Sequence, residues 1–124
     1  MIKLVTLLSR RPDLSVEEFI ERYETGHRLL GEKYLRKHAC RYVRRFCRPA
    51  PGPLFDGASP PPCDVVMEIW FPDREAYDAT METLADPAVA AEIAEDEERL
   101  FDRSRTTSFV VEEYESMIAR YDHA

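Results

Sequence analysis

Four short segments of the chain have the hydrophobic patterns of β-strands. Residues 2–9 form an apolar run without clean alternation, which predicts a strand covered on both faces. Residues 39–47 and 64–71 combine apolar, β-branched and aromatic side chains with a period of two. Residues 105–114 are predicted to form the last strand. We therefore expect four strands at these positions.

A long helix is predicted over residues 15–35. Residues 15–18 have the form of a capping box, in which the Ser15 hydroxyl accepts a hydrogen bond from the Glu18 amide. On a helical wheel, six apolar or aromatic side chains fall within roughly 60° of the first: Val16, Phe19, Ile20, Tyr23, Leu30 and Tyr34. His27 lies in the middle of this stripe, and Gly26 before it predicts a kink or a close approach by another segment.

Two more helices follow the third strand. Asp73 is a suitable N-cap for a helix that begins at Arg74, and Asp86-Pro87 has the cap-then-proline order that begins another. The acidic run within residues 92–98 is predicted to be a solvated face of this last helix.

Residues 48–63 contain six prolines and two glycines, so they predict a long surface loop. Leu54 and Phe55 are too apolar for a simple tether. We expect them to pack over the open end of a pocket or across a dimer seam.

The order strand–helix–strand, loop, strand–helix–helix–strand predicts an α+β fold, the ferredoxin-like split βαβ. It would have a four-stranded antiparallel sheet with helices on one face, in a single domain spanning residues 1–124. The opposite face also carries apolar side chains, and a second copy of the chain is the simplest cover.

Composition and charge narrow the possible partners. The formal net charge is −7, which disfavours general binding to nucleic acids or anionic membranes. Residues 1–48 hold 12 Lys/Arg and 6 Asp/Glu. This uneven charge indicates two solvated faces of opposite sign, which we favour. The alternatives are a local basic patch, or two halves that attract each other in a dimer.

Three cysteines without a C-x-x-C pair favour reduced thiols over a disulfide framework or a zinc site. The first twelve residues lack the organisation of a signal peptide, and no segment has the length of a membrane span. We therefore expect a cytoplasmic protein.

Several short motifs occur in a defined order: Arg11-Pro12, Leu14-Ser15, Glu17-Glu18-Phe19, Tyr23, His27, Leu30, Arg41-Tyr42-Val43, residues 64–71, Glu95-Asp96-Glu97 and Phe101-Asp102. In this order the chain resembles the EthD domain family, a branch of the dimeric α+β barrel superfamily, over roughly residues 2–113. It departs from the family at Arg44 and Arg45, where relatives often have amide or His residues, and in its long proline-rich loop.

The resemblance implies a ferredoxin-like protomer, a homodimer whose two sheets face each other, and a pocket between each sheet and its own helices. Members resemble helpers of bacterial oxidative degradation clusters and dehydratase- or decarboxylase-like enzymes of fungal aromatic polyketide pathways. The superfamily also includes cofactor-free monooxygenases, lactone isomerases and polyketide cyclases. Fold analogy does not choose among these activities.

His27 is the leading catalytic candidate. A neutral imidazole that lines an apolar pocket can accept a proton from carbon or oxygen. The alternative is a structural histidine bonded to a strand carbonyl or to Tyr42. The family match at this position favours the catalytic role.

Other candidates surround this histidine in the predicted fold. A phenol can stabilise enolate charge, which suits Tyr42 and Tyr23, although packing is favoured for Tyr23. The family motif places Asp64 near the pocket mouth, and Trp70 belongs either to the core, to the interface or to the substrate site. We predict His27, Tyr42 and Asp64 as catalytic residues, and Tyr23, Phe55, Trp70 and Arg44 as substrate-binding residues.

The basic residues between 33 and 48 suit a carboxylate-bearing aromatic ligand, but we favour a solvated surface or pairing with the acidic helix. The sequence lacks the common nucleotide, flavin, zinc and calcium motifs, so no cofactor and no metal is predicted. Three hypotheses remain: a cofactor-independent dehydratase, isomerase or cyclase acting on an apolar or aromatic metabolite, a non-catalytic binding protein, and a structural or regulatory dimer. Without a redox cofactor, proton transfer is favoured over oxidation, although a cofactor-free monooxygenase stays open.

Overall fold

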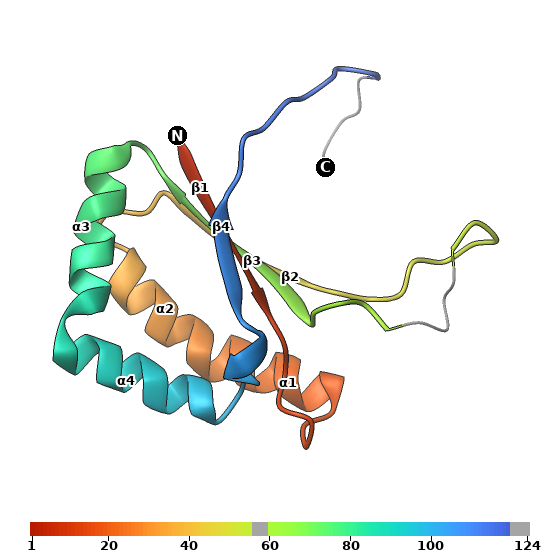
Figure 1. Ribbon diagram of the computed structural model, residues 1–124, viewed down its shortest axis with the longest axis horizontal. Helices are drawn as coiled ribbons and strands as arrows, with labels where there is room; N and C mark the ends of the chain where they lie inside the picture. Colours follow the sequence, from red (N-terminus) through yellow and green to blue (C-terminus); the bar gives the residue numbers. More distant parts are fainter. Residues whose placement is uncertain (56–59, 120–124) are drawn as a thin grey trace.

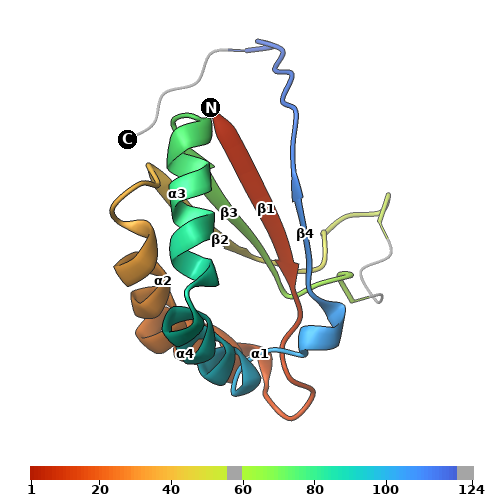
Figure 2. The ribbon, with the colours of Figure 1, turned by 60° about the vertical axis from the view of Figure 1, so that its left-hand side comes forward.

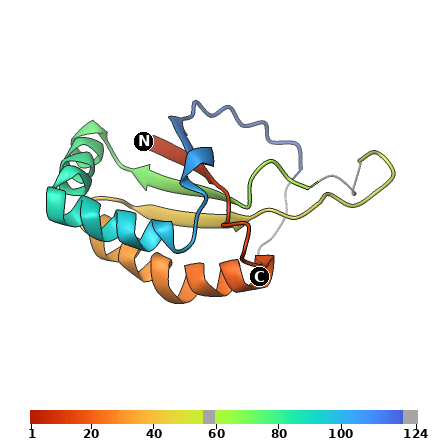
Figure 3. The ribbon, with the colours of Figure 1, turned by 60° about the horizontal axis from the view of Figure 1, so that its bottom comes forward.

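The computed structural model describes residues 1–55 and 60–119. A four-stranded antiparallel sheet has its helices packed on one face (Figures 1 and 3). The strands are β1 (Ile2–Leu8), β2 (Arg41–Phe46), β3 (Val65–Phe71) and β4 (Thr107–Val110), in the spatial order β2-β3-β1-β4. This is the order of the split βαβ fold, so the predicted fold is confirmed.

The helical layer has two arms. The first comprises α1 (Val16–Arg22), the π-helical turn η1 (Tyr23–His27) and α2 (Arg28–Leu35), which follow one another without interruption. The second comprises α3 (Arg74–Ala85) and α4 (Pro87–Glu98), and the short 3₁₀ turn η2 (Arg103–Arg105) leads into β4. Figures 1 and 3 show α4 running alongside the first arm. In the described part of the chain, no helix combines the length and apolar character needed to cross a membrane.

The predicted helix starts are confirmed by their caps. Ser15 Oγ accepts the Glu18 N–H at 3.1 Å, and Asp73 Oδ1 accepts the Ala76 N–H at 2.8 Å. Asp86 accepts the N–H groups of Ala88 and Val89. Each cap satisfies backbone donors that a helix leaves unpaired in its first turn.

The strands are shorter than predicted at their ends. Ala39 still donates its N–H to Leu35 O, so it completes the helix rather than starting β2. Asp102 accepts the Ser104 N–H and so caps the turn at residues 103–105, which delays β4 until Thr107. Polar side chains that bond to nearby backbone compete with the sheet in this way.

The core is densely aromatic near the helix arms. Phe19 and Tyr23 are both fully buried and pack edge-to-face against Phe46 and Phe101 at centroid distances between 5.6 and 6.1 Å. A second cluster joins Leu35, Ile69, Phe71 and Ala76. The two clusters tie both helix arms to the same face of the sheet.

The described parts of the proline-rich segment between β2 and β3, residues 47–55 and 60–64, extend away from the helices (Figures 1 and 2). Leu54 is 88% exposed and Phe55 is 59% exposed. The predicted packing of these two side chains over the pocket of their own chain is therefore wrong. Their contact with a second copy stays a prediction, and residues 56–59 of the predicted loop lie outside the described residues.

Candidate functional site

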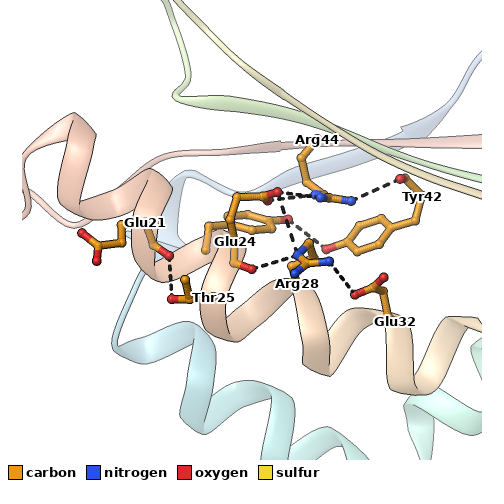
Figure 4. Close-up of polar contacts among 8 residues, drawn as sticks. Glu21, Glu24, Thr25, Arg28, Glu32, Tyr42 and Arg44 are labelled. Atoms are coloured by element: carbon orange, nitrogen blue, oxygen red, sulfur yellow. Dashed lines mark hydrogen bonds and ion pairs between the residues drawn. The ribbon is translucent and has the colours of Figure 1, made fainter.

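The π-helical turn is the local irregularity around which the site is built. The Arg28 N–H bonds to Tyr23 O, five residues back rather than four. Such a turn leaves helix carbonyls free for other donors, and two side chains use them. Thr25 Oγ1 donates to Glu21 O at 2.7 Å, and Arg28 Nε donates to Glu24 O at 2.8 Å (Figure 4). The turn thus holds Tyr23 and His27 in fixed positions relative to one another.

His27 forms a hydrogen bond with α4. Its Nδ1 lies 2.6 Å from Asp96 Oδ2, and the two side chains are 13% and 31% exposed. Its ring also packs edge-to-face on Tyr23 and Phe101, at 5.1 Å from each ring centroid. A carboxylate can only accept, so Nδ1 carries the proton and Nε2 keeps the lone pair in the neutral ring.

A cavity of about 270 Å³ adjoins this pair. Its wall includes Arg22, Gly26, His27, Asp96, Arg99 and Leu100. It therefore lies between η1 and the C-terminal end of α4. The pocket that we predicted for His27 between the helix and the sheet is wrong in its location, because Tyr23, Phe46 and Phe101 fill that space.

A second cavity of about 270 Å³ separates the end of α2 from the edge strand β2. Tyr42 and Arg41 line it from the strand, and Glu32, Leu35 and Arg36 line it from the helix. Tyr42 thus borders a different cavity from His27.

Tyr23 and Tyr42 meet inside the helix–sheet layer. Their hydroxyls are 3.2 Å apart and bond to each other. Burial raises the pKa of both phenols, and for Tyr23 the neighbouring Tyr42 raises the pKa further. The pair therefore stays protonated at neutral pH. It is placed to hold the helix against β2.

Gly31 makes room for this pair. A Cβ at Gly31 would lie 2.9 Å from Tyr42 Oη and 3.0 Å from Cε2, whereas a Cβ at Gly26 would meet no heavy atom within 4 Å. Of the two alternatives predicted at Gly26, a kink or a close approach, the close approach is not found there, and it occurs about one and a half turns later at Gly31. The irregularity at Gly26 is the π-turn.

Arg44 binds within the chain, on the same side of the sheet as Tyr42. Its Nη2 and Nε contact the two carboxylate oxygens of Glu24 at 2.7 and 3.0 Å (Figure 4). The hydrogen bond to Glu24 raises the pKa of this guanidinium, and its Cζ lies 4.9 Å from the centroid of the Tyr42 ring. A substrate would have to compete with a bidentate carboxylate for this side chain.

Three other predicted site residues lie apart from His27. Asp64 Oδ2 accepts the Arg10 N–H at 2.8 Å, and its Oδ1 lies 3.3 Å from Arg10 Nε, at the end of β1. Trp70 lies on the sheet face opposite the helices, with Lys3 Nζ 3.8 Å from its ring centroid. Phe55 lies in the proline-rich segment and is exposed.

The sequence analysis missed Asp96 and Glu24 as site residues. Asp96 was assigned to a solvated acidic face, although the family motif includes Glu95-Asp96-Glu97. The presence of Asp96 in this motif was the signal that could have identified it as a partner for His27 on the neighbouring helix. Glu24 carried no signal, because its bond to Arg44 spans 20 residues and depends on the π-turn. Within the described residues, no group of three or more His, Cys, Asp or Glu side chains is placed to hold a metal ion.

The fold of the chain is similar to that of several solved structures. The chain is similar to an ethyl tert-butyl ether D (EthD) family protein from Bacillus halodurans, with a TM-score of 0.60, 16% identity, and coverage of 92% of this chain and 100% of that one. HapK from Hahella chejuensis gives a TM-score of 0.56 at 14% identity, covering 98% and 100%. An antibiotic biosynthesis monooxygenase gives 0.52 at 15% identity, covering 93% and 100%.

At these identities the solved structures establish the shared α+β barrel fold alone. Among curated proteins, none matches the chain. The model of the EthD domain matches residues 11–104, which is most of the chain and includes both His27 and Asp96. The chain therefore belongs to the EthD domain family.

Proposed function

We propose that this protein is a small enzyme that needs no cofactor and uses His27 as a general base, oriented by Asp96. The contact of 2.6 Å between His27 Nδ1 and Asp96 Oδ2, at the wall of a cavity, is the observation that carries the proposal. A carboxylate that fixes one imidazole nitrogen leaves the other as the base and stabilises the imidazolium that forms.

The proposed reaction is a proton transfer on a small apolar or aromatic metabolite. Nε2 of His27 takes a proton from a carbon or a hydroxyl of the substrate, and the resulting imidazolium returns it to the departing hydroxyl or to another substrate atom. This sequence serves a dehydratase, an isomerase or a cyclase equally. A cavity of about 270 Å³ suits a molecule with about one ring. Arg22 and Arg99 on its wall favour a substrate that also carries an anionic group.

A non-catalytic binding protein is the second candidate, and the tyrosine pair supports it. Tyr23 and Tyr42 bond to each other rather than to the His27 cavity. A proton-transfer site there lacks the phenol donor that the sequence analysis expected. A protein that only holds an aromatic carboxylate for a partner enzyme needs no such donor.

Deuterium exchange tests the proposal and separates the two candidates. The probes are one-ring aryl keto acids in D₂O, with binding followed by thermal shift and carbon–hydrogen exchange followed by proton NMR. If His27 is the base, His27→Ala should lower the exchange rate by about 10²–10⁴-fold and leave probe binding nearly unchanged. His38→Ala is the matched control. Probe binding by the wild-type protein without exchange would favour the binding protein, and equal exchange by wild type and His27→Ala would overturn the proposed base.

We also propose that the functional form is a homodimer joined through the open sheet face. Val66 and Trp70 lie on that face with Val5 and Phe109, and Phe109 is 41% exposed. Apolar side chains on one uncovered sheet face favour a second layer. Light scattering should give twice the chain mass, and Trp70→Glu should shift the mass towards the monomer. A monodisperse monomer at micromolar concentration would overturn this arrangement.

A further inference from the structure

Two cysteines meet where the proline-rich segment leaves and rejoins the sheet. Cys47 follows the last residue of β2, and Cys63 stands two residues before β3. Their Sγ atoms are 3.8 Å apart, and both are free thiols. They are separated by 16 positions in sequence, and the sequence analysis gave no reason to pair them.

The backbone on both sides of this pair is already held. The Cys47 N–H donates to Asp64 O at 2.9 Å, and the Asp64 N–H donates to Leu8 O at 2.9 Å. A disulfide needs an S–S distance of about 2.05 Å, so the sulfur atoms must approach by about 1.8 Å. Rotation about the Cα–Cβ bonds of two cysteines in neighbouring chain segments can supply such a movement.

We propose that Cys47 and Cys63 form an oxidation site, which closes to an intramolecular disulfide by exchange with a low-molecular-weight disulfide of the glutathione type. The proposal is independent of the proposed enzymatic function. It assigns a chemical role to two of the three cysteines, whereas the sequence analysis expected all three to be simple reduced thiols.

The thiol–disulfide exchange takes place in two steps. The Cys47 thiolate attacks one sulfur of the small disulfide, which gives a mixed disulfide on Cys47 and releases one small thiol. The Cys63 thiolate then attacks the Cys47 sulfur and releases the second small thiol. Two protein thiols lose two electrons and two protons, and the small disulfide gains both to become two thiols.

The surroundings decide which cysteine reacts first. Cys63 is 8% exposed, and burial, together with the hydrogen bond between its thiol and Cys47, raises the pKa of the Cys63 thiol to about 11. Asp64 adds to this effect, while the nearby Arg105 guanidinium opposes it and also donates to Pro62 O at 3.2 Å. Cys47 is the more exposed of the two, so it is the entry point and Cys63 is the resolving thiol.

Cys40 provides a control within the same chain. It is exposed, and its Sγ lies 3.3 Å from Trp70 O and 3.8 Å from Met1 Sδ. Since it borders neither member of the pair, oxidation of Cys40 should stop at a mixed disulfide.

Oxidation of the full chain with glutathione disulfide tests the site. Intact-mass spectrometry should show a loss of about two mass units at Cys47–Cys63, confirmed by a cross-linked peptide in a non-reducing digest. The cross-link closes a short loop in the unfolded chain, so the oxidised form should melt roughly 5–10 °C above the reduced form. Dithiothreitol should reverse both changes.

The serine variants make the outcome decisive. Cys47→Ser should block the cross-link and slow all modification of Cys63, Cys63→Ser should stop at a glutathione adduct on Cys47, and Cys40→Ser should behave like the wild type at the pair. A wild-type protein that accumulates the Cys47 adduct without closing would overturn the proposal. So would disulfides formed only between chains through Cys40.

Discussion

The two sides of the helix over residues 16–35 use different chemistry. The side that faces the sheet is held mainly by aromatic packing: Tyr23 is fully buried in an aromatic cluster, and Gly31 lets the Tyr42 ring approach the helix backbone. The side that faces α4 is polar and open, with a His27–Asp96 contact, a Tyr34–Glu92 hydrogen bond and a cavity.

Within this one helix, the residues that stabilise the fold lie on a different side from the residues of the candidate site. Burial of apolar surface is the largest favourable contribution to folding, and both a cavity and an extra methyl group in a packed core lower stability. Partly exposed polar contacts contribute little stability, so their geometry is available for other uses. The π-turn makes the separation possible because Tyr23 and His27, four residues apart, form hydrogen bonds with different partners, Tyr42 and Asp96, while their rings remain in contact.

The sheet side should give the largest effect on stability. Tyr23→Ala removes a ring that contacts Phe19, Phe46 and Phe101 and leaves the Tyr42 hydroxyl without its partner. The free energy of unfolding should fall by about 3–5 kcal/mol. Urea denaturation measures it, with the 89% exposed Tyr114→Ala as a control that should stay within about 0.5 kcal/mol of the wild type. A loss below about 1 kcal/mol in Tyr23→Ala would contradict the assignment of stability to this side.

The α4 side should instead affect the proposed chemistry. Asp96→Asn keeps the size of the side chain but can offer an N–H to Nδ1, which favours the tautomer with the proton on Nε2. The rate of deuterium exchange on the aryl keto acid probe should fall roughly 10–100-fold, while the melting temperature changes little. Glu98→Gln, at an exposed position on the same helix, is the control. An unchanged exchange rate in Asp96→Asn would remove Asp96 from the proposed site.

Two glycines of the helix test the difference in packing. Gly31→Ala places a methyl group against Tyr42, and overpacking should exceed the gain in helix propensity, for a net loss of about 1–2 kcal/mol. Gly26→Ala meets no atom within 4 Å, and its φ is not positive, so it should gain about 0.5–1 kcal/mol. Chemical denaturation of both variants measures the contrast. If both were stabilised, the Tyr42 ring would not be held as tightly as we infer.

These glycines also show how far the sequence predicts the structure. Caps and periodicity act over three or four residues, so Ser15, Asp73 and Asp86 were recognised as helix starts from local pattern alone. The strand order followed from the connections. A close approach joins residues distant in sequence, and hydrophobic spacing does not report which glycine it uses.

The candidate site was predictable only in part for the same reason. The wheel identified His27 because its own helix carries the signal. Its partner Asp96 is 69 residues away, in an acidic run where each carboxylate has the same local pattern. Only the packing of α4 against η1 selects one of them. The π-turn itself changes the angular position of each residue after Tyr23, so an ideal wheel directed His27 towards the sheet instead of α4.

The smallest effect should come from the second polar contact to α4. Tyr34 Oη donates to Glu92 Oε2 at 2.5 Å, and this hydrogen bond, aided by Lys33, lowers the pKa of the Glu92 carboxyl. A carboxyl with a lowered pKa stabilises the folded state above its unfolded pKa, and this contribution is lost as pH falls through the folded pKa. Tyr34→Phe should therefore raise the pKa of Glu92 part of the way back, because Lys33 remains. It should weaken the protein slightly at neutral pH, and less so as the pH falls through the folded pKa of Glu92. Carboxyl NMR titration measures the pKa of Glu92, and urea midpoints at neutral and acid pH measure the change in stability.

Tyr77→Phe is the control for this prediction. The Tyr77 ring packs on Phe71 at 5.3 Å, so this variant should leave the Glu92 titration unchanged. A Tyr34→Phe variant with the wild-type pKa of Glu92 would mean that the contact does not persist in solution, and the α4 side would then be held by His27 and Asp96 and by the packing of α3 and α4.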